Sequence, residues 1–303
     1  MHAADPADLL TKVATFHLKH ARYGATALAD GDYLYVVGGS QRGELITNIE
    51  RMHGQTGQSV KITDEIIPRQ HGCATMVNRK IYIFGGWTHG QRKGDPDGRV
   101  EMFDLATGRL TQVARMPKPR AHMTAVVRGG KVHLIGGQMR SKDSLVQTSV
   151  MEIYDPATDR WSEGPPMPTP RETDAVLVGD FVLALGGFAG NAAVSKVELF
   201  VPAENVWKAL PDLMRRTSAH SAAFLGEHVF LFGDYGSLSS VLAYDLKNRT
   251  SRAIKPGLEG TRHSSAVAHN GRIYVVGGNT DEQGTALDLV QVFELRRSGA
   301  VQR

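Results

Sequence analysis

The chain has little of what several protein classes require. A single cysteine, Cys73, among 303 residues excludes an internal disulfide and favours a reducing compartment, so we expect a cytoplasmic protein. No apolar run is long enough to span a bilayer, which argues against membrane insertion. The N-terminal residues lack the charged and then apolar pattern of a secretion signal. The stretch from Asp5 to Leu10 instead favours one capped turn of helix.

An excess of charge of one sign is also missing. The chain has 35 lysines and arginines against 31 aspartates and glutamates, and its formal net charge is +4 at pH 7. This small excess favours anionic ligands slightly and does not indicate a nucleic-acid partner. The hydrophobic content of 41% and the 33 glycines are typical of an all-β protein rich in turns. Nothing in the composition implies an oligomer, so we expect a monomer.

One short motif is repeated along the chain. It is a mostly apolar run that ends in two glycines, as in Ile81–Gly86, although the fifth copy has Asp234 in place of its second glycine. The first glycines are 47, 51, 50, 47 and 44 residues apart, a period typical of repeated supersecondary units. A β-branched run ended by glycine predicts a buried strand that leads into a tight turn. The six first glycines are Gly38, Gly85, Gly136, Gly186, Gly233 and Gly277.

Each repeat is expected to contain three strands in addition to the apolar run. A short alternating strand precedes the apolar run, and Asn270-Gly271 is a strong hairpin signal between the two in the last repeat. Downstream, a third strand ends in an aromatic residue that an acidic one usually follows, as in Tyr154-Asp155, and in two repeats a tryptophan stands seven residues after this aromatic. Four strands per repeat, in sheets that cannot bury both faces alone, predict a β-propeller.

The double glycines, the period and the stretch from Tyr154 to Trp161 resemble the kelch-repeat family. The resemblance implies an all-β fold: one six-bladed β-propeller over residues 1–303, with four antiparallel strands per blade. We expect it to stand alone, without adaptor domains. The last repeat lacks a fourth strand, so we expect Val13–Phe16 to supply it and thereby remove an open sheet edge. The expected blade cores are residues 22–66, 69–116, 120–167, 171–213, 216–256, and 262–295 with 13–16.

An arginine stands just before the first strand of every repeat, 15 to 17 residues ahead of the first glycine. Because arginine offers a planar, permanently charged fork, this set is interpreted as a basic ring that binds carboxylates or phosphates. The alternative is that most of these arginines hold loop carbonyls of a neighbouring blade. The ring is Arg22, Arg69, Arg120, Arg171, Arg216 and Arg262, and all but Arg216 enter the predicted ligand-binding set.

Three imidazoles and a carboxylate share the position fourteen residues before the first glycine, where Gly24 and Ala219 occupy the other two repeats. Imidazole titrates near neutrality and can donate or accept a proton, so these groups are candidate acid-base residues if the protein is an enzyme. The alternative is that the histidines bond only to loop backbone. The four candidates are His71, His122, Glu172 and His263, and nearby Tyr23, Asp174 and His220 join the predicted ligand-binding set.

The loops that follow the double glycines differ in length, and variable loops carry specificity. The longest begin at Trp87 and Gln138 and add cations, Arg140 among them, to the side where the histidines stand. The aromatic residues in these loops are expected either to stack on a sugar ring or planar ligand or to wedge one blade against the next. The loop residues in the predicted ligand-binding set are Trp87, Gln138, Arg140, Phe188 and Tyr235.

Several catalytic signatures are absent. No closely spaced set of metal ligands is found, so we expect no cofactor, with a transition metal on the dispersed histidines as the alternative. Cys73 is interpreted as a small buried residue rather than a nucleophile, and His133 as a core histidine. The chain has no Gly-x-Ser-x-Gly elbow and no phosphate-binding glycine loop.

Two functions of different class remain open. The first is a recognition module whose mouth binds an anionic small molecule or an acidic peptide, as the kelch resemblance implies. The second is an enzyme, an isomerase or mutarotase, a lyase or a cyclase, acting on a carboxylated small molecule. It would use the histidines as acid and base and the arginines to hold the carboxylate. We expect no nucleic acid and no membrane as a partner.

Overall fold

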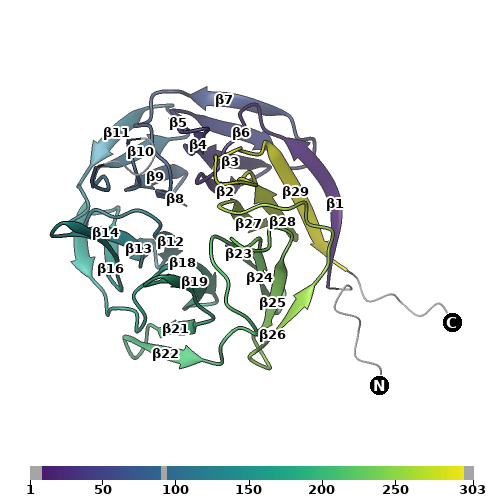
Figure 1. The fold of residues 1–303 in the computed structure, drawn as a ribbon. Coiled ribbons are helices and arrows are strands. Elements are labelled where there is room, and N and C mark those ends of the chain that lie inside the picture. Colours follow the sequence, from purple (N-terminus) through teal and green to yellow (C-terminus); the bar gives the residue numbers. More distant parts are fainter. Residues whose placement is uncertain (1–8, 90–93, 297–303) are drawn as a thin grey trace, which may run out of the picture.

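The computed structural model describes residues 9–89 and 94–296, and within them the chain forms strands, turns and loops without a helix. Six twisted sheets stand around one axis like the blades of a propeller (Figure 1). In each sheet the first strand lies next to the axis and the fourth lies at the outer rim. The prediction of an all-β, six-bladed propeller is therefore confirmed. No helix that could cross a membrane occurs in the described residues.

The first three blades use consecutive parts of the chain. Blade 1 contains β2 (Thr26–Asp30), β3 (Tyr33–Val37), β6 (Ile49–His53) and β7 (Ser59–Thr63). Blade 2 contains β8 (Cys73–Val77), β9 (Lys80–Phe84), β10 (Val100–Asp104) and β11 (Leu110–Val113). Blade 3 contains β12 (Thr124–Arg128), β13 (Lys131–Ile135), β16 (Met151–Asp155) and β17 (Arg160–Glu163). Two small hairpins extend from blades 1 and 3, namely β4 (Ser40–Gln41) with β5 (Glu44–Leu45), and β14 (Gln138–Ser141) with β15 (Ser144–Gln147).

The last three blades complete the ring. Blade 4 contains β18 (Glu172–Val178), β19 (Phe181–Ala189), β21 (Val197–Val201) and β22 (Val206–Leu210), with β20 (Ala192–Ala193) paired to the end of β19. Blade 5 contains β23 (Ser221–Leu225), β24 (His228–Phe232), β25 (Val241–Asp245) and β26 (Thr250–Ile254). Blade 6 contains β27 (Ser265–His269), β28 (Arg272–Val276), β29 (Leu289–Leu295) and the N-terminal β1 (Leu10–His17).

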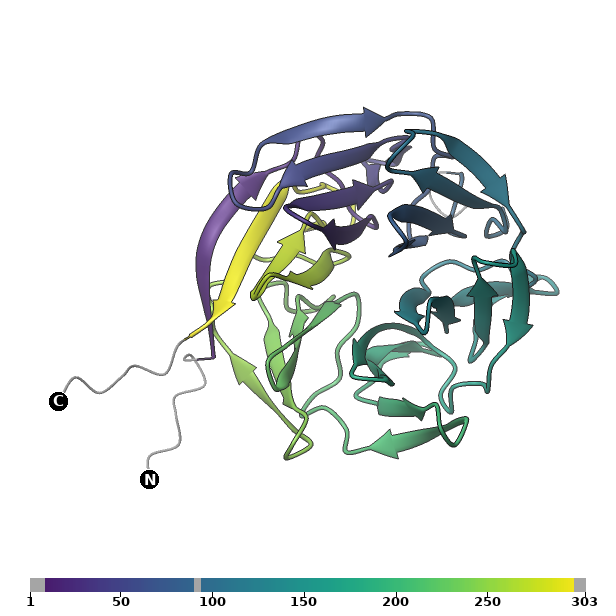
Figure 2. The ribbon, with the colours of Figure 1, turned by 180° about the vertical axis from the view of Figure 1, so that it is seen from behind.

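Both ends of the described chain meet in blade 6, as predicted. Strand β1 runs antiparallel to β29, from Leu10 opposite Leu295 to His17 opposite Leu289. Figures 1 and 2 show the two strands side by side at the rim, one purple and one yellow. The strand is longer than the predicted Val13–Phe16. The predicted helical turn at Asp5 to Leu10 is wrong at Leu10, which begins β1, while residues 5–8 lie outside the described ones.

The double glycines let each blade approach the next. Gly85 has φ +55°, and a Cβ added there would lie 2.3 Å from the carbonyl oxygen of Arg120 in the following blade. The same carbonyl accepts a hydrogen bond from the Gly86 amide at 2.9 Å. No L side chain fits this combination of left-handed backbone and close contact. The repeated glycines that reveal the period are therefore joints between neighbouring blades.

The sheets pack face to face around the ring, and their interfaces contain most of the buried apolar side chains. The two blade tryptophans also connect neighbours. Trp161 Nε1 donates to the Ala114 carbonyl oxygen of blade 2, and Trp207 Nε1 donates to Pro165 of blade 3, both at 3.0 Å. Each of these indoles holds its own outer strand against the blade before it.

Candidate functional site

A central cavity of about 1120 Å³ runs down the propeller axis. Residues from the first strands of all six blades line it, and many of them are small, such as Ala74, Ala125 and Ala266. Farther along the same strands the lining includes Leu28, Val127, Leu177 and Phe224, so that part of the channel is largely apolar. The volume slightly exceeds the range of about 300–1,000 Å³ that is usual for small-ligand sites.

Polar groups collect where the first strands begin and where the loops follow the double glycines; we call this end of the channel the mouth. Of the residues predicted from the sequence as site residues, the structure places nine on the lining of the cavity. They come from blades 2 to 6. These nine are His71, His122, Gln138, Glu172, Asp174, Phe188, His220, Tyr235 and His263.

Three imidazoles from three blades form a cluster at the mouth. The ring of His71 stacks on that of His122 with a centroid distance of 4.1 Å and an interplanar angle of 22°. The rings of His263 and His71 meet edge to face with a centroid distance of 5.1 Å, and the ring centroids of Tyr23 and His71 are 5.9 Å apart. His263 Nδ1 is also 3.0 Å from Asn279 Oδ1. Residues far apart in the sequence thus converge around the axis.

A collar of backbone hydrogen bonds positions these histidines. The His71 amide donates to the Gly24 carbonyl, the His122 amide to His71, the Gly24 amide to His263, and the His263 amide to Ala219, at 2.7 to 2.9 Å. All five residues have φ between +51° and +60°. This left-handed backbone turns each side chain across the mouth. The shared sequence offset of the histidines therefore reflects a shared backbone conformation.

Gly24 provides the space that the imidazoles share. A Cβ at Gly24 would lie 3.0 Å from Cε1 and Nδ1 of His71, so a side chain in blade 1 would compete with that ring. Ala219 has the same backbone conformation in blade 5 but only a methyl group. The imidazoles therefore fill the mouth on the side of blades 6, 1, 2 and 3. On the opposite side, Ala219 adds no imidazole to the mouth.

Blade 4 departs from the common pattern. It has one residue fewer between its arginine and its double glycine, so Glu172 lies one place earlier than sequence counting implied, opposite Phe188 in the β18–β19 ladder. Its carboxylate still reaches the cluster: Oε2 is 3.3 Å from His122 Nδ1, and Gln147 Nε2 donates to Oε1 at 3.3 Å. A histidine-carboxylate pair therefore lines the cavity between blades 3 and 4.

The predicted ring of ligand-binding arginines requires correction. The guanidinium groups of blades 1 to 4 point into their own sheets, where each pairs with a buried glutamate of the third strand. The nitrogen-oxygen distances are 3.0, 2.7, 2.5 and 2.5 Å in blade order. None of the four lines the cavity within the described part of the chain. The pairs are Arg22–Glu50, Arg69–Glu101, Arg120–Glu152 and Arg171–Glu198.

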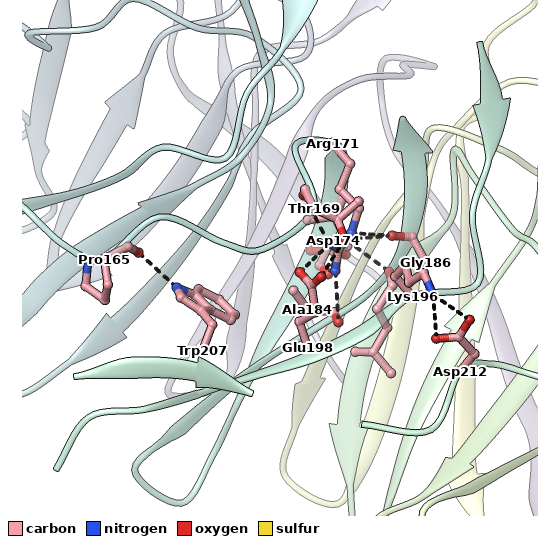
Figure 3. Close-up of polar contacts among 12 residues, drawn as sticks. Pro165, Thr169, Arg171, Asp174, Ala184, Gly186, Lys196, Glu198, Trp207 and Asp212 are labelled. Carbon is pink, nitrogen blue, oxygen red and sulfur yellow. Dashed lines mark hydrogen bonds and ion pairs between the residues drawn. The ribbon is translucent and has the colours of Figure 1, made fainter. Parts of the chain in front are cut away.

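Figure 3 shows this arrangement for Arg171. Its Nη1 contacts Glu198, its Nε donates to the Gly186 carbonyl at 2.8 Å, and Thr169 donates its hydroxyl to the same glutamate at 2.6 Å. Burial lowers the pKa of the arginine, although Glu198 opposes that shift. The alternative interpretation, that these arginines hold loop carbonyls, describes the geometry better, but the carbonyl belongs to the same blade.

Blades 5 and 6 lack this ion pair, and their sequences differ from those of the other blades at both of its positions. Where the other blades have arginine and glutamate, blade 5 has Thr217 and Leu242. Blade 6 has Thr261, whose hydroxyl donates to Gly277, and Gln291. The arginine and the glutamate are present or absent together. This joint occurrence is visible in the sequence, and it could have identified the arginine and the glutamate as a structural pair.

The remaining two arginines have different surroundings. Arg262 is buried over the ring of Tyr235, with its Cζ 4.0 Å from the ring centroid, and it does not line the cavity within the described residues. Arg216 is exposed and lines the cavity. It is the one arginine or lysine among the described lining residues, and no salt bridge engages it in that part of the chain. The predicted basic ring thus reduces to a single cation at the mouth.

Asp174 and His220 lie on the cavity wall but are engaged by the protein. Asp174 accepts hydrogen bonds from the hydroxyl of Thr124 and the amide of Ala222, which tie blade 4 to blades 3 and 5, and burial raises its pKa. His220 Nε2 is 3.0 Å from the Leu185 carbonyl, and burial lowers the pKa of this imidazole to about 4. His220 is therefore neutral near pH 7 and donates to that carbonyl.

The other predicted contact residues divide into two groups. Phe188, Gln138 and the half-exposed Tyr235 line the cavity. Trp87 is fully buried, so its proposed stacking on a ligand is corrected to a packing role. The remaining two, Tyr23 and Arg140, do not belong to the described lining. The ring of Tyr23 lies near those of His71 and His263, and Arg140 pairs with Asp95 at 2.7 Å.

The charges on the cavity wall are few. The carboxylates among the described lining residues are Glu172, Asp174 and Asp234, and each accepts hydrogen bonds from the protein. The described residues contain no cluster of three histidine, cysteine or acidic side chains that could hold a metal ion. Cys73 also lines the channel, and burial raises the pKa of its thiol to about 12, which suppresses the reactive thiolate.

The chain matches kelch-repeat domains and is similar to several known proteins. The KLHDC2/KLHL20/DRC7 Kelch-repeats domain matches residues 24–234, and a Kelch motif matches residues 260–297. The chain is similar to the Kelch-like protein terF of Aspergillus terreus (26% identity, 71% of this chain and 51% of that protein). It is also similar to Kelch-like protein 38 of Mus musculus (25%, 82% and 42%) and to alpha-scruin of Limulus polyphemus (23%, 76% and 27%).

The chain spans about half or less of the length of these curated relatives. Among solved structures, that titled "Structure of YjhT" aligns with a TM-score of 0.77 at 16% identity, over 91% of this chain and 95% of that one. At this identity the likeness shows the fold alone. The repeats, the six four-stranded blades and the matched family domain agree, and the chain belongs to the kelch-repeat family, whose propellers bind ligands or partner proteins.

Proposed function

We propose that this protein is a recognition module that binds an anionic group, on a small molecule or an acidic peptide, at the mouth of the central channel. Arg216 carries the proposal, because its guanidinium is exposed on the lining and is engaged by no salt bridge among the described residues. An always-charged fork in such a position is suited to a carboxylate or phosphate. Among the described residues, no ion pair joins it to the lining carboxylates Glu172, Asp174 and Asp234.

The rest of the mouth suits the same ligand. His71, His122 and His263 contribute imidazole groups, and Tyr235 and Phe188 contribute aromatic surface on the opposite side. Below them, the apolar wall of the channel can accept an uncharged body or side chain. The expected ligand therefore has an anionic head that stays at the rim and a less polar part that enters the channel.

Calorimetric titration tests the proposal with glucuronate, citrate and a glutamate-rich octapeptide as probes. Reversing the charge with Arg216→Glu is expected to weaken binding of the best probe at least about tenfold, because a charge-assisted hydrogen bond becomes a repulsion. The matched control is Arg140→Glu, which makes the same change at an arginine outside the described lining. Equal losses in both variants, or no binding of any probe to the wild type, would count against the proposal.

A second candidate function is an isomerase, lyase or cyclase that acts on a carboxylated small molecule. The close approach of His122 and Glu172 on the cavity wall favours it, since such a pair can move a proton to or from a bound substrate. His122→Gln separates the two functions. Under recognition it retains most of the affinity for the probe, whereas under catalysis it binds the substrate and loses turnover.

A further inference from the structure

A second hollow opens beside the mouth, between blades 3 and 4. It has a volume of about 760 Å³ and lies between the β14–β15 hairpin and the turn from β19 to β20. It shares Gln138, Phe188 and Asn191 with the central cavity, so the two are continuous. Its other described lining residues are Leu145, Val146, Gln147, Thr169, Pro170, Ala189 and Gly190.

One wall of this groove is the open edge of a strand. In the part of the chain that the structure describes, β15 pairs with β14 alone, and no strand lies along its other edge. The hairpin is closed by Ser141 opposite Ser144, and antiparallel pairs alternate between hydrogen-bonded and non-hydrogen-bonded. Leu145 and Gln147 therefore fall in non-hydrogen-bonded pairs, and their peptide groups point away from β14, on the groove side.

The other wall exists because blade 4 is built differently. Strand β19 has nine residues and continues past its double glycine to pair with β20, whereas the second strands of the other blades have five residues. This extension raises Phe188 to Asn191 beside the mouth. The groove is therefore a channel with two walls, and it leads to the cavity.

The chemistry of the groove fits main chain better than charged side chains. None of its described lining residues carries a charge. Three of them, Gln138, Gln147 and Asn191, have carboxamides, which can both donate to and accept from peptide groups. Val146 exposes 37% of its surface, and Leu145 is partly exposed. An uncharged extended chain matches an open strand edge flanked by carboxamides and aliphatic groups.

We propose that an extended, uncharged peptide segment binds in this groove as an added strand on β15, with adjoining residues of the same peptide reaching the central cavity. The inference rests on the proposed function, because it makes the ligand of the mouth a polypeptide rather than a free small acid. The main-chain bonds to Leu145 and Gln147 provide affinity, and the anionic group at Arg216 provides selectivity.

The probe is a phage-displayed library of random linear peptides about 12 residues long, selected on the wild-type protein. Selected peptides are synthesised and titrated by fluorescence polarisation. Leu145→Pro removes an amide that the hairpin does not use, so the hairpin forms while the added strand loses a donor. It is expected to weaken binding at least about tenfold. Leu145→Ala keeps that amide and removes only side-chain contact, so it is expected to weaken binding less than Leu145→Pro does.

A second measurement does not depend on any variant. Bound peptide is expected to slow hydrogen exchange of the Leu145 and Gln147 amides in the wild type, and the thermal unfolding curve of Leu145→Pro shows that the variant is folded. Unchanged affinity in a folded Leu145→Pro variant, or unprotected amides, overturns the groove as the site. A library that yields no binder, or a self-association of the chain that Leu145→Pro abolishes, overturns the peptide as occupant. In each case Arg216→Glu with glucuronate or citrate still decides the proposed function separately.

Discussion

At the scale of single residues, charge in this protein serves two separate purposes. Arg171 and its counterparts in blades 1 to 3 are buried with glutamates and hold their own sheets together. Arg216 lies on the cavity lining without such a partner among the described residues. The same residue type at nearly the same place in the repeat therefore contributes to structure in four blades and is available for binding in one.

Removing one member of a buried pair tests the structural role. Arg171→Thr leaves Glu198 buried without its cation and is expected to lower the free energy of unfolding by about 3–5 kcal/mol. The double variant Arg171→Thr/Glu198→Leu copies the Thr217 and Leu242 pair of blade 5 and is expected to lose much less. Urea denaturation measures both. If the double variant is as unstable as the single one, the loss of stability does not come from leaving Glu198 without its cation.

His220 predicts a pH dependence of stability. Its pKa falls from 6.5 to about 4 in the folded protein because burial disfavours the imidazolium. The unfolded chain therefore binds an extra proton between these values, and the stabilising contribution of neutral His220, complete above about pH 6.5, is lost as the pH falls. Relative to His220→Gln, the wild type is expected to lose about 3 kcal/mol between neutral pH and pH 4. Urea denaturation at several pH values measures this difference, and parallel curves would show that His220 is not the cause.

At the scale of elements, the N-terminal strand closes the ring. Leu10 is 1% exposed in a cluster with Phe293 and Ile254, so β1 adds core as well as backbone pairing to blade 6. Leu10→Ala is expected to lower the free energy of unfolding by about 2–5 kcal/mol. The control is Val13→Ala in the same strand, where 44% of the side chain is exposed. Similar losses for both substitutions in urea denaturation would argue against a closing role for β1.

The spacing of residues in the repeats predicted the blades but only part of the site. The glycine period predicted the blades because a left-handed glycine is required wherever one blade contacts the next. The common sequence offset of His71, His122 and His263 marked them as candidates, but the contacts between their rings were not predicted, because spacing does not reveal the left-handed backbone that all three share. Counting placed Glu172 one position off, because blade 4 is a residue shorter there.

The arginines of blades 1 to 4 were misplaced for a different reason. A residue at the start of an inner strand can point to the channel or into its own sheet, and sequence position does not distinguish the two. The deciding groups were the glutamates of the third strands, which lie far along the chain. Partner residues, rather than spacing, determined which side chains reach the mouth.

At the scale of the whole molecule, six repeats form one ring with an uneven mouth. Blades 6, 1, 2 and 3 place imidazoles, aromatic side chains or glycine there, while blades 4 and 5 supply Glu172, Arg216 and an exposed tyrosine. A near-symmetric scaffold therefore presents an asymmetric site, which can orient an asymmetric ligand. The cytoplasmic location, the monomeric state and the lack of a cofactor stay predictions from the sequence.

The most direct test of the binding site is an NMR titration of the protein labelled at its histidine rings, with the glutamate-rich octapeptide or glucuronate as probe. Binding at the mouth is expected to shift the ring signals of His71, His122 and His263, which line the cavity, and to leave those of His133 and His53 unchanged. The Arg216→Glu variant is expected to require much higher probe concentrations for the same shifts. Shifts confined to His133 or His53, or identical titrations of both proteins, would contradict an anion site at this mouth.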